Sequence, residues 1–129
     1  MTGLLLDTNA FAMILTDDPR LPALARERLG EAGRVALGAI SFHEIGRKVR
    51  LGRWPEMAPF AAGLVDRARE DGVELLPLSP AAAIEASLLD WDHRDPFDRM
   101  IAVIARREGL TLVSSDAAFD TLGLGRLWG

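Results

Sequence analysis

The chain contains no cysteine, only two histidines and a single lysine among its 129 residues. Without cysteine, disulfides, zinc–thiolate sites and cysteine nucleophiles are excluded, and two histidines are too few for a histidine-rich metal site. No apolar run reaches the ~18 residues that a membrane-spanning helix needs, and the first residues lack the basic segment of a signal peptide. We therefore expect one cytoplasmic domain, residues 1–129, with no membrane association.

Acidic residues outnumber basic ones by 19 to 15, which gives a net charge of -4. An acidic protein is not held to nucleic acid by its overall charge, although a local basic rim can still contact phosphates. Basic residues, nearly all arginine, cluster at residues 47–53, 94–99 and 106–107. Each cluster is either such a rim or a solvated helix face.

Apolar runs alternate with segments of helical periodicity along the chain. Strands are predicted at residues 3–7, 35–40, 73–78, 111–114 and 126–128. Helices are predicted at residues 9–15, 22–31, 41–51, 57–71, 80–89 and 96–108, with one helical turn at 117–122. This alternation predicts an α/β fold with a mainly parallel sheet.

Four acidic residues, Asp7, Glu44, Asp98 and Asp116, stand at four strand-to-helix junctions. Asp7 and Asp116 directly follow apolar runs, whereas the other two lie one turn into helices. Because the carboxyl ends of parallel strands meet at one edge, we expect the four carboxylates to gather there. Clustered carboxylates need a counter-charge, and Mg²⁺ or Mn²⁺ prefers oxygen ligands. The sequence therefore predicts a metal-dependent enzyme that acts on phosphates.

These acids also have purely structural explanations. Asp7 and Asp116 could each cap the helical segment that follows. Ser41 and Glu44 match a capping box, with Ser41 at the N-cap and Glu44 three residues later. Glu44 could also pair with Lys48 across one helical turn. Helix N-termini attract anions, so capping and metal binding are compatible roles.

Four motifs occur in a fixed order along the chain. They are Leu6-Asp7-Thr8-Asn9, Ser41-x-x-Glu44, the run HRDPFDRMIA from His93 to Ala102, and Leu112-Val113-Ser114-Ser115-Asp116 with Phe119 behind it. Each motif alone is weak, but the ordered set resembles the PIN-domain family of metal-dependent ribonucleases. Within that family it is most similar to the VapC-type toxins of bacterial toxin–antitoxin pairs. The resemblance covers essentially the whole chain and implies a three-layer α/β/α fold.

The resemblance also implies a set of site residues. The metal-binding and catalytic acids would be Asp7, Glu44, Asp98 and Asp116, and the metal Mg²⁺ (or Mn²⁺). The accessory residues would be Asp95, Thr8, Asn9 and Ser114. Asp95 and Asp98 lie one helical turn apart, and we assign Asp98 as the ligand because its spacing to Ile101-Ala102 fits the family pattern better. Asp120 is a further candidate for a water-mediated role.

The implied activity is Mg²⁺-dependent endonucleolytic cleavage of RNA by metal-activated water, leaving a 3′-hydroxyl and a 5′-phosphate. Candidates for guiding the RNA backbone are Arg47, Arg50, Arg94 and Arg99. Single-stranded or looped RNA is the favoured substrate, because duplex RNA buries its base edges. The toxin class implies a small antitoxin protein as partner and a homodimer. An apolar groove near Trp54, Met57 and Phe60 is the predicted antitoxin site.

Two alternatives belong to other classes. A phosphoacceptor receiver domain also has an acidic pocket, but it requires paired acids after the first strand and a lysine after the last. Here Asp7 is followed by Thr8-Asn9, and the only lysine, Lys48, lies on a predicted helix. The second alternative is a non-catalytic interaction module with the PIN fold, which a metal titration would separate from an enzyme.

Overall fold

A five-stranded parallel sheet forms the centre of the computed structural model, which describes residues 3–129. The strand order is β3-β2-β1-β4-β5, and every neighbouring pair is parallel. The strands are β1 (Leu4–Leu6), β2 (Val35–Gly38), β3 (Glu74–Leu76), β4 (Thr111–Val113) and β5 (Arg126–Leu127). The predicted α/β class with a mainly parallel sheet is confirmed.

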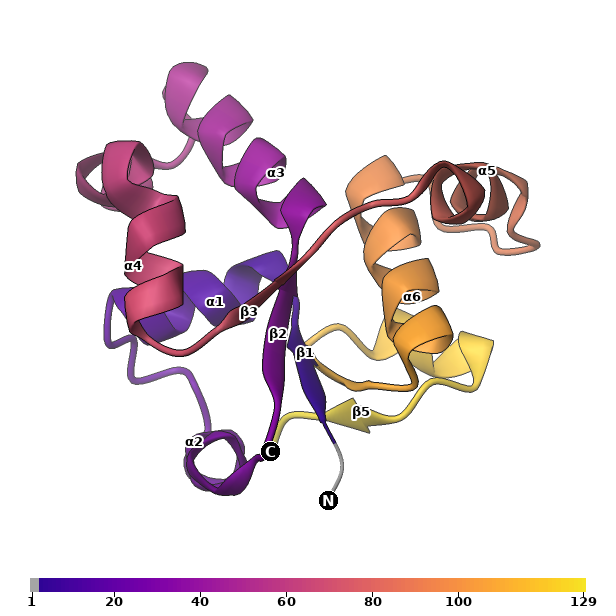
Figure 1. Cartoon of the computed structure of the whole chain (residues 1–129), viewed down its shortest axis with the longest axis horizontal. Helices are drawn as coiled ribbons and strands as arrows, with labels where there is room; N and C mark the ends of the chain where they lie inside the picture. Colours follow the sequence, from indigo (N-terminus) through magenta and orange to yellow (C-terminus); the bar gives the residue numbers. More distant parts are fainter. Residues whose placement is uncertain (1–2) are drawn as a thin grey trace.

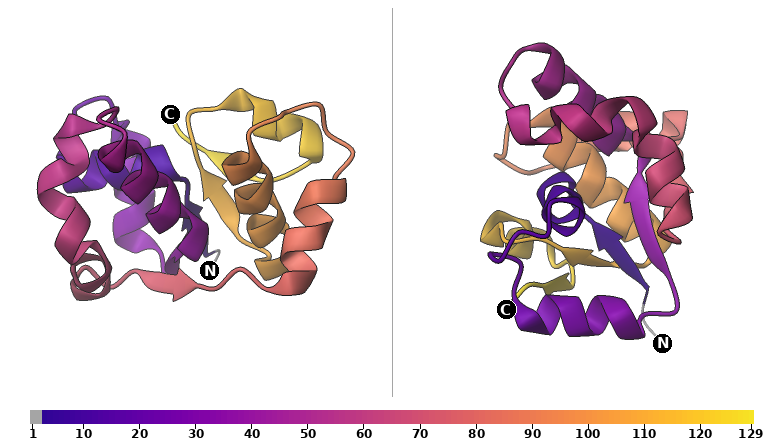
Figure 2. Two further views of the ribbon diagram at one scale, coloured as in Figure 1. Left: turned by 90° about the horizontal axis from the view of Figure 1, so that it is seen from above. Right: turned by 90° about the vertical axis from the view of Figure 1, so that its left-hand side faces the viewer.

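Helices cover both faces of this sheet, which gives three layers (Figure 1). One face carries α1 (Thr8–Leu15), α2 (Ala23–Glu31), α3 (Ala39–Arg50) and α4 (Leu64–Glu70), and the other carries α5 (Pro80–Leu88) and α6 (Pro96–Glu108). Two 3-10 segments, η1 (Pro55–Gly63) and η2 (Ala117–Leu122), complete the chain. The view from above in Figure 2 shows the same division into two helical layers. Within residues 3–129, no helix is both long and apolar enough to span a membrane.

The position of β1 at the centre of the sheet explains why its sequence is continuously apolar. Leu4 and Leu6 belong to the core cluster under α1 and α3, whereas Leu5 belongs to the cluster under α6. Successive side chains of a strand point to opposite faces, and both faces of this sheet are covered. Burial on both sides fixes β1, and with it the position of the residue that follows, Asp7.

The start of α3 differs from the prediction. The helix begins at Ala39 with Gly38 as N-cap, so Ser41 lies inside the helix and the predicted capping box does not form. Ser41 is fully buried, and its hydroxyl oxygen accepts a hydrogen bond from Thr8 Oγ1 at 2.9 Å. Ser41 therefore makes a tertiary hydrogen bond to Thr8 instead of capping its own helix. It also ties the start of α1 to α3.

The segment after α3 corrects a second prediction. Residues 55–63 form the 3-10 segment η1 instead of the first half of a long helix, because Pro59 lies inside it and has no N–H to donate. Met57 is fully buried, and Trp54 and Phe60 pack against the same core cluster. Of the three residues of the predicted apolar groove, Met57 therefore belongs to the core, whereas Trp54 and Phe60 stay partly exposed. Trp54 instead lines a cavity of about 690 Å³ along α1 whose walls are mostly polar.

Candidate functional site

Asp7 and Asp116 lie side by side at the carboxyl edge of the sheet, because β1 and β4 are neighbouring strands. Asp7 Oδ1 accepts from the Ala10 N–H at 2.7 Å, and Asp116 Oδ1 accepts from the Ala118 N–H at 2.9 Å. Both acids are thus N-caps, as predicted. Ser114 lies between them: its Oγ accepts from the Asp116 N–H at 3.0 Å, and it also hydrogen-bonds the carboxylate of Asp7.

Glu44 reaches the same edge from α3. Its side chain is only 8% exposed. Oε2 pairs with Lys48 Nζ at 3.0 Å, which is the predicted pair across one helical turn. Oε1 is buried and has no hydrogen-bond partner within residues 3–129. A buried carboxylate oxygen without a partner raises the free energy of the folded state. A cation or a hydrogen-bond donor next to Glu44 Oε1 would remove this penalty.

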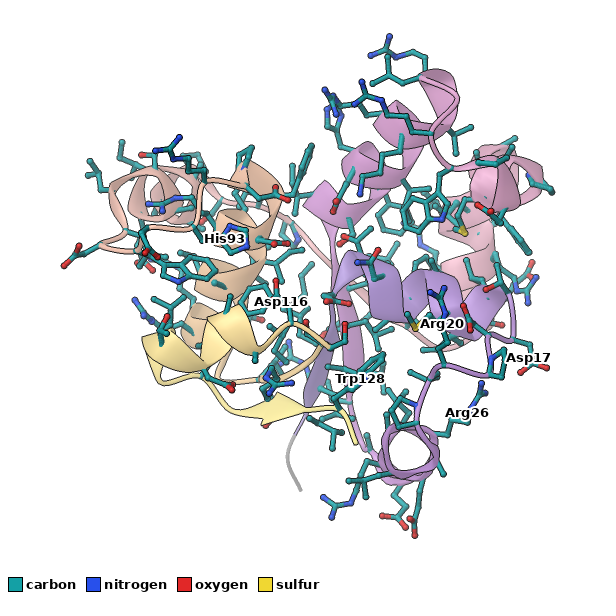
Figure 3. The ribbon with its side chains drawn as sticks, turned by 180° about the vertical axis from the view of Figure 1, so that it is seen from behind. Asp17, Arg20, Arg26, His93, Asp116 and Trp128 are labelled. Carbon is teal, nitrogen blue, oxygen red and sulfur yellow. The ribbon has the colours of Figure 1, made fainter. Side chains whose placement is uncertain are left out.

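Asp98 completes the edge from the first turn of α6, with His93 beside it. His93 Nε2 lies 3.0 Å from Asp98 Oδ2 and 3.8 Å from Asp116 Oδ2. Figure 3 shows His93 and Asp116 near one another, beside α6 and the start of η2. Ligand atoms of these three residues all lie within 4.8 Å of one another.

Burial, with repulsion from neighbouring carboxylates, raises the pKa values of Asp98 and Asp7. Burial raises the pKa of Asp98 to about 7, and the carboxylates of Asp95, Glu44 and Asp7 add to the shift, against the effect of His93. Burial is also the main cause of the raised pKa of Asp7. Hydrogen bonds from Ser114 and Ala10 oppose that rise, and Glu44 and Asp116 increase it. The structure therefore brings the four predicted acids into one electrostatic site.

The hydrogen bonds of His93 assign its tautomer. The backbone N–H of Asp95 donates to His93 Nδ1 at 3.2 Å, so Nδ1 is the acceptor of the ring. The ring proton then lies on Nε2, 3.0 Å from Asp98 Oδ2. A metal would need a lone pair on Nε2, so in this tautomer His93 presents an N–H group to the acids instead of a ligand atom. Sequence reasoning missed this residue, although a histidine in the polar loop before Asp98 was a usable signal.

Arg99 has a structural role that replaces its predicted contact with RNA. Its guanidinium donates to five backbone carbonyls, those of Ala86, Ser87, Leu89, Trp91 and His93. These contacts hold the connection from α5 to α6, which carries both His93 and Asp95. The ring of Trp91 packs on His93, with centroids 4.7 Å apart. Because its guanidinium N–H groups already donate to these carbonyls, Arg99 is not available to contact a phosphate.

The accessory residues have varied positions. Thr8 is buried and bonded to Ser41, whereas Asn9 is exposed and makes no side-chain hydrogen bond in the described part of the chain. Asp95 caps α6 by accepting from the Phe97 N–H at 2.9 Å. Asp120 pairs with Arg126 at 2.8 Å, which lowers the pKa of Asp120.

The remaining basic candidates stay on the surface. Arg47, Arg50 and Arg94 are exposed, and none forms an ion pair within residues 3–129. Lys48, which pairs with Glu44, lies 5.1 Å from the centroid of the Trp54 ring. The exposed arginines are therefore available to a polyanion.

The donor set fits a hard divalent cation. Asp7, Glu44, Asp98 and Asp116 offer carboxylate oxygens, which Mg²⁺ and Mn²⁺ prefer. The buried Oε1 of Glu44, which has no partner among residues 3–129, is an independent observation consistent with a cation at this edge. The fold and this edge together define an α/β protein with an acidic site at the carboxyl ends of parallel strands.

Comparison with known families gives the class a name. The PIN domain family model matches residues 4–124, so the chain belongs to the PIN domain family. No curated protein matches the chain.

Solved structures share the fold at low identity. VapC20 of Mycobacterium tuberculosis, described as a Sarcin-Ricin loop cleaving toxin, is 13% identical with a TM-score of 0.72 over 98% of this chain and 100% of that one. DNA-bound VapBC of Salmonella typhimurium is 23% identical, with a TM-score of 0.66 over 98% of both chains. FitAcB of Neisseria gonorrhoeae is 24% identical, with a TM-score of 0.64 over 96% of both.

Proposed function

We propose that this protein is a Mg²⁺- or Mn²⁺-dependent endoribonuclease. The observation that carries the proposal is the buried Glu44 Oε1, which has no partner among the described residues and lies in a site of mutually repelling carboxylates. Membership of the PIN domain family supports nuclease chemistry, and it removes the receiver-domain alternative.

The chain's own residues have distinct tasks in this proposal. Asp7, Glu44, Asp98 and Asp116 hold the cation, which when bound supplies an activated water and neutralises charge during phosphodiester hydrolysis. The His93 donor orients the carboxylate of Asp98. Arg47, Arg50 and Arg94 contact the RNA backbone outside the acids. Hydrolysis breaks the bond from phosphorus to the 3′-oxygen, which leaves a 3′-hydroxyl and a 5′-phosphate.

Cleavage by the purified protein tests this function. Labelled single-stranded RNA is incubated with Mg²⁺, with Mn²⁺ and with EDTA, and the products are resolved by size. We expect cleavage only with metal, and a loss of orders of magnitude in Asp98→Asn, Glu44→Gln, Asp7→Asn and Asp116→Asn. Asp66→Asn, an exposed acid on α4, is the matched control. Cleavage that is unchanged in all four variants would contradict the site assignment.

We further propose that the protein is the toxin of a toxin–antitoxin pair, acts in the cytoplasm and forms a homodimer. Support comes from the fold shared with VapC20 and with the VapBC and FitAcB complexes. Expression alone should arrest growth and degrade RNA, whereas co-expression with a cognate antitoxin should prevent both. Harmless high-level expression of an active nuclease would contradict the toxin role and leave the nuclease proposal standing.

A further inference from the structure

Phe97 is an aromatic residue without a place in the core. The chain has five phenylalanines and three tryptophans. Across residues 3–129, seven of these eight side chains belong to a core cluster or pack against one, and Phe97 is the exception. It is partly exposed in the first turn of α6, one residue before Asp98. Packing of the fold therefore gives no reason for an aromatic ring at this position.

Phe97 forms one wall of a cavity between α3 and α6. The cavity has a volume of about 410 Å³ and is also lined by His43, Glu44 and Arg47. The rings of His43 and Phe97 face each other from the two helices, with centroids 5.9 Å apart and planes tilted by 33°. Because Glu44 lines both this cavity and the acidic edge, a ligand can occupy the cavity and reach the acids together.

The charges around the cavity select the kind of ligand. His43 and Arg47 are exposed and lie one turn apart on α3, so they present an aromatic ring and a cation on the same face. The acids Glu44 and Asp95 also line the cavity and disfavour a free anion beside them, and Lys48, which lines it too, is paired with Glu44. A flat neutral base that stacks on the exposed part of the His43–Phe97 pair, with its phosphate at Arg47, satisfies both conditions. Single-stranded nucleic acid alternates these two groups, and basic grooves with aromatic platforms bind it.

We propose that this cavity is a nucleobase subsite that binds an unpaired base of the RNA next to the cleaved phosphate. The proposal rests on the ribonuclease function above and defines its substrate as RNA with an accessible, unstacked base. Duplex RNA does not offer such a base, so single strands and loops bind and paired stems do not.

RNA affinity without cleavage tests the subsite. A fluorescein-labelled RNA of six adenosines is titrated with protein in Ca²⁺ instead of Mg²⁺, and binding is followed by fluorescence anisotropy. Phe97→Leu keeps an apolar side chain but removes the ring, and should weaken binding about tenfold. Arg47→Gln should reduce the slope of log affinity against log salt by about 0.7. Leu88→Ala and Arg69→Gln, exposed residues outside this cavity, are the matched controls and should bind like the wild type.

Removal of single bases from the RNA shows whether the ring contacts a base. Abasic ribose at one position should weaken wild-type binding to the level of Phe97→Leu, and should not weaken that variant further. Equal losses in both proteins, or wild-type affinity in Phe97→Leu, would overturn the proposal. If Phe97→Leu does not fold, His43→Ala, at an exposed position, serves in the same experiment.

This test separates the subsite from the enzyme activity. Loss of binding in Phe97→Leu with no cleavage by the wild type would refute the ribonuclease function and keep the base site. Cleavage by the wild type with binding indifferent to Phe97 and His43 would refute the base site alone.

Discussion

His93 Nε2 lies 3.0 Å from Asp98 Oδ2, while the Asp95 N–H donates to the other ring nitrogen of His93 at 3.2 Å. The two contacts place the ring proton between His93 and Asp98. His93 thus holds the Asp98 carboxylate in position, and it presents no lone pair that would compete with this carboxylate for a metal. Such support by a neighbouring side chain is common around metal-binding acids.

His93→Ala should therefore lower Mn²⁺ affinity by about 10- to 100-fold. His93→Gln, whose amide nitrogen can donate from a similar position, should recover part of the loss. In the Co²⁺-loaded protein, the visible absorption bands should keep their positions in both variants, because no ligand has changed. A shift of those bands in His93→Gln would show that His93 is a ligand and that its assigned tautomer is wrong.

Arg99 should matter for stability more than any exposed arginine. Arg99→Gln removes charge-assisted bonds to carbonyls along residues 86–93, and we expect a loss of about 3 kcal/mol in the free energy of unfolding. Arg94→Gln, at an exposed position of the same loop, should change it by less than about 0.5 kcal/mol. Urea unfolding measures both. Equal stability of the two variants would mean that the carbonyl contacts do not stabilise the loop.

Asp98 should make the metal-free protein less stable as pH rises. Burial, with repulsion from Asp95, raises its folded-state pKa to about 7, whereas an unfolded aspartate has a pKa of about 3.9. The folded state therefore binds the proton more tightly. Its stabilising effect is complete below about pH 4 and is lost as pH rises through about 7. The raised pKa of Asp7 acts in the same direction.

Thermal melts in EDTA between pH 5 and pH 8 measure this dependence. The melting temperature of the wild type should fall across that range, and Asp98→Asn should show a flatter profile. Mg²⁺ at a hundredfold excess over its Kd should restore about 2.7 kcal/mol at neutral pH. A wild-type profile as flat as that of Asp98→Asn would contradict the raised pKa.

Substitutions at Asp7 can separate its two roles. Asparagine also caps helices, so Asp7→Asn should keep the bond from the Ala10 N–H and leave metal-free stability nearly unchanged or higher. Asp7→Ala should lose about 1 kcal/mol through the missing cap. Both variants should bind Mn²⁺ poorly, as measured by calorimetry. Normal metal binding by Asp7→Asn would leave Asp7 as a cap alone.

Much of this arrangement could be predicted from local sequence. Pro96 at the first position and Gly109 in the left-handed region at the end give α6 its predicted limits. The proximity of Asp7 and Asp116 could be predicted because each follows a strand of a parallel sheet. The start of α3 could not be predicted, because the partner of Ser41 is the hydroxyl of Thr8, 33 residues away. Gly38 at that junction also lies close to α6: a Cβ there would be 3.0 Å from Ile104 Cδ1.

The roles of His93 and Arg99 depend on the path of one loop. No periodicity governs residues 89–95, and their shape follows from carbonyls that turn toward the Arg99 guanidinium. From the sequence alone, a basic residue beside a cluster of acids indicates a phosphate contact as readily as a structural role in the loop. Only the fold shows that its donors are already used.

Calorimetric titration with Mn²⁺ tests the central claim most directly. The wild type should bind the ion, and Glu44→Gln and Asp98→Asn should each weaken binding by at least about tenfold, because each removes a carboxylate from the site. Asp66→Asn should bind like the wild type. If the wild type takes up no divalent metal, or if all three variants bind it as well as the wild type does, then these acids do not form a metal site.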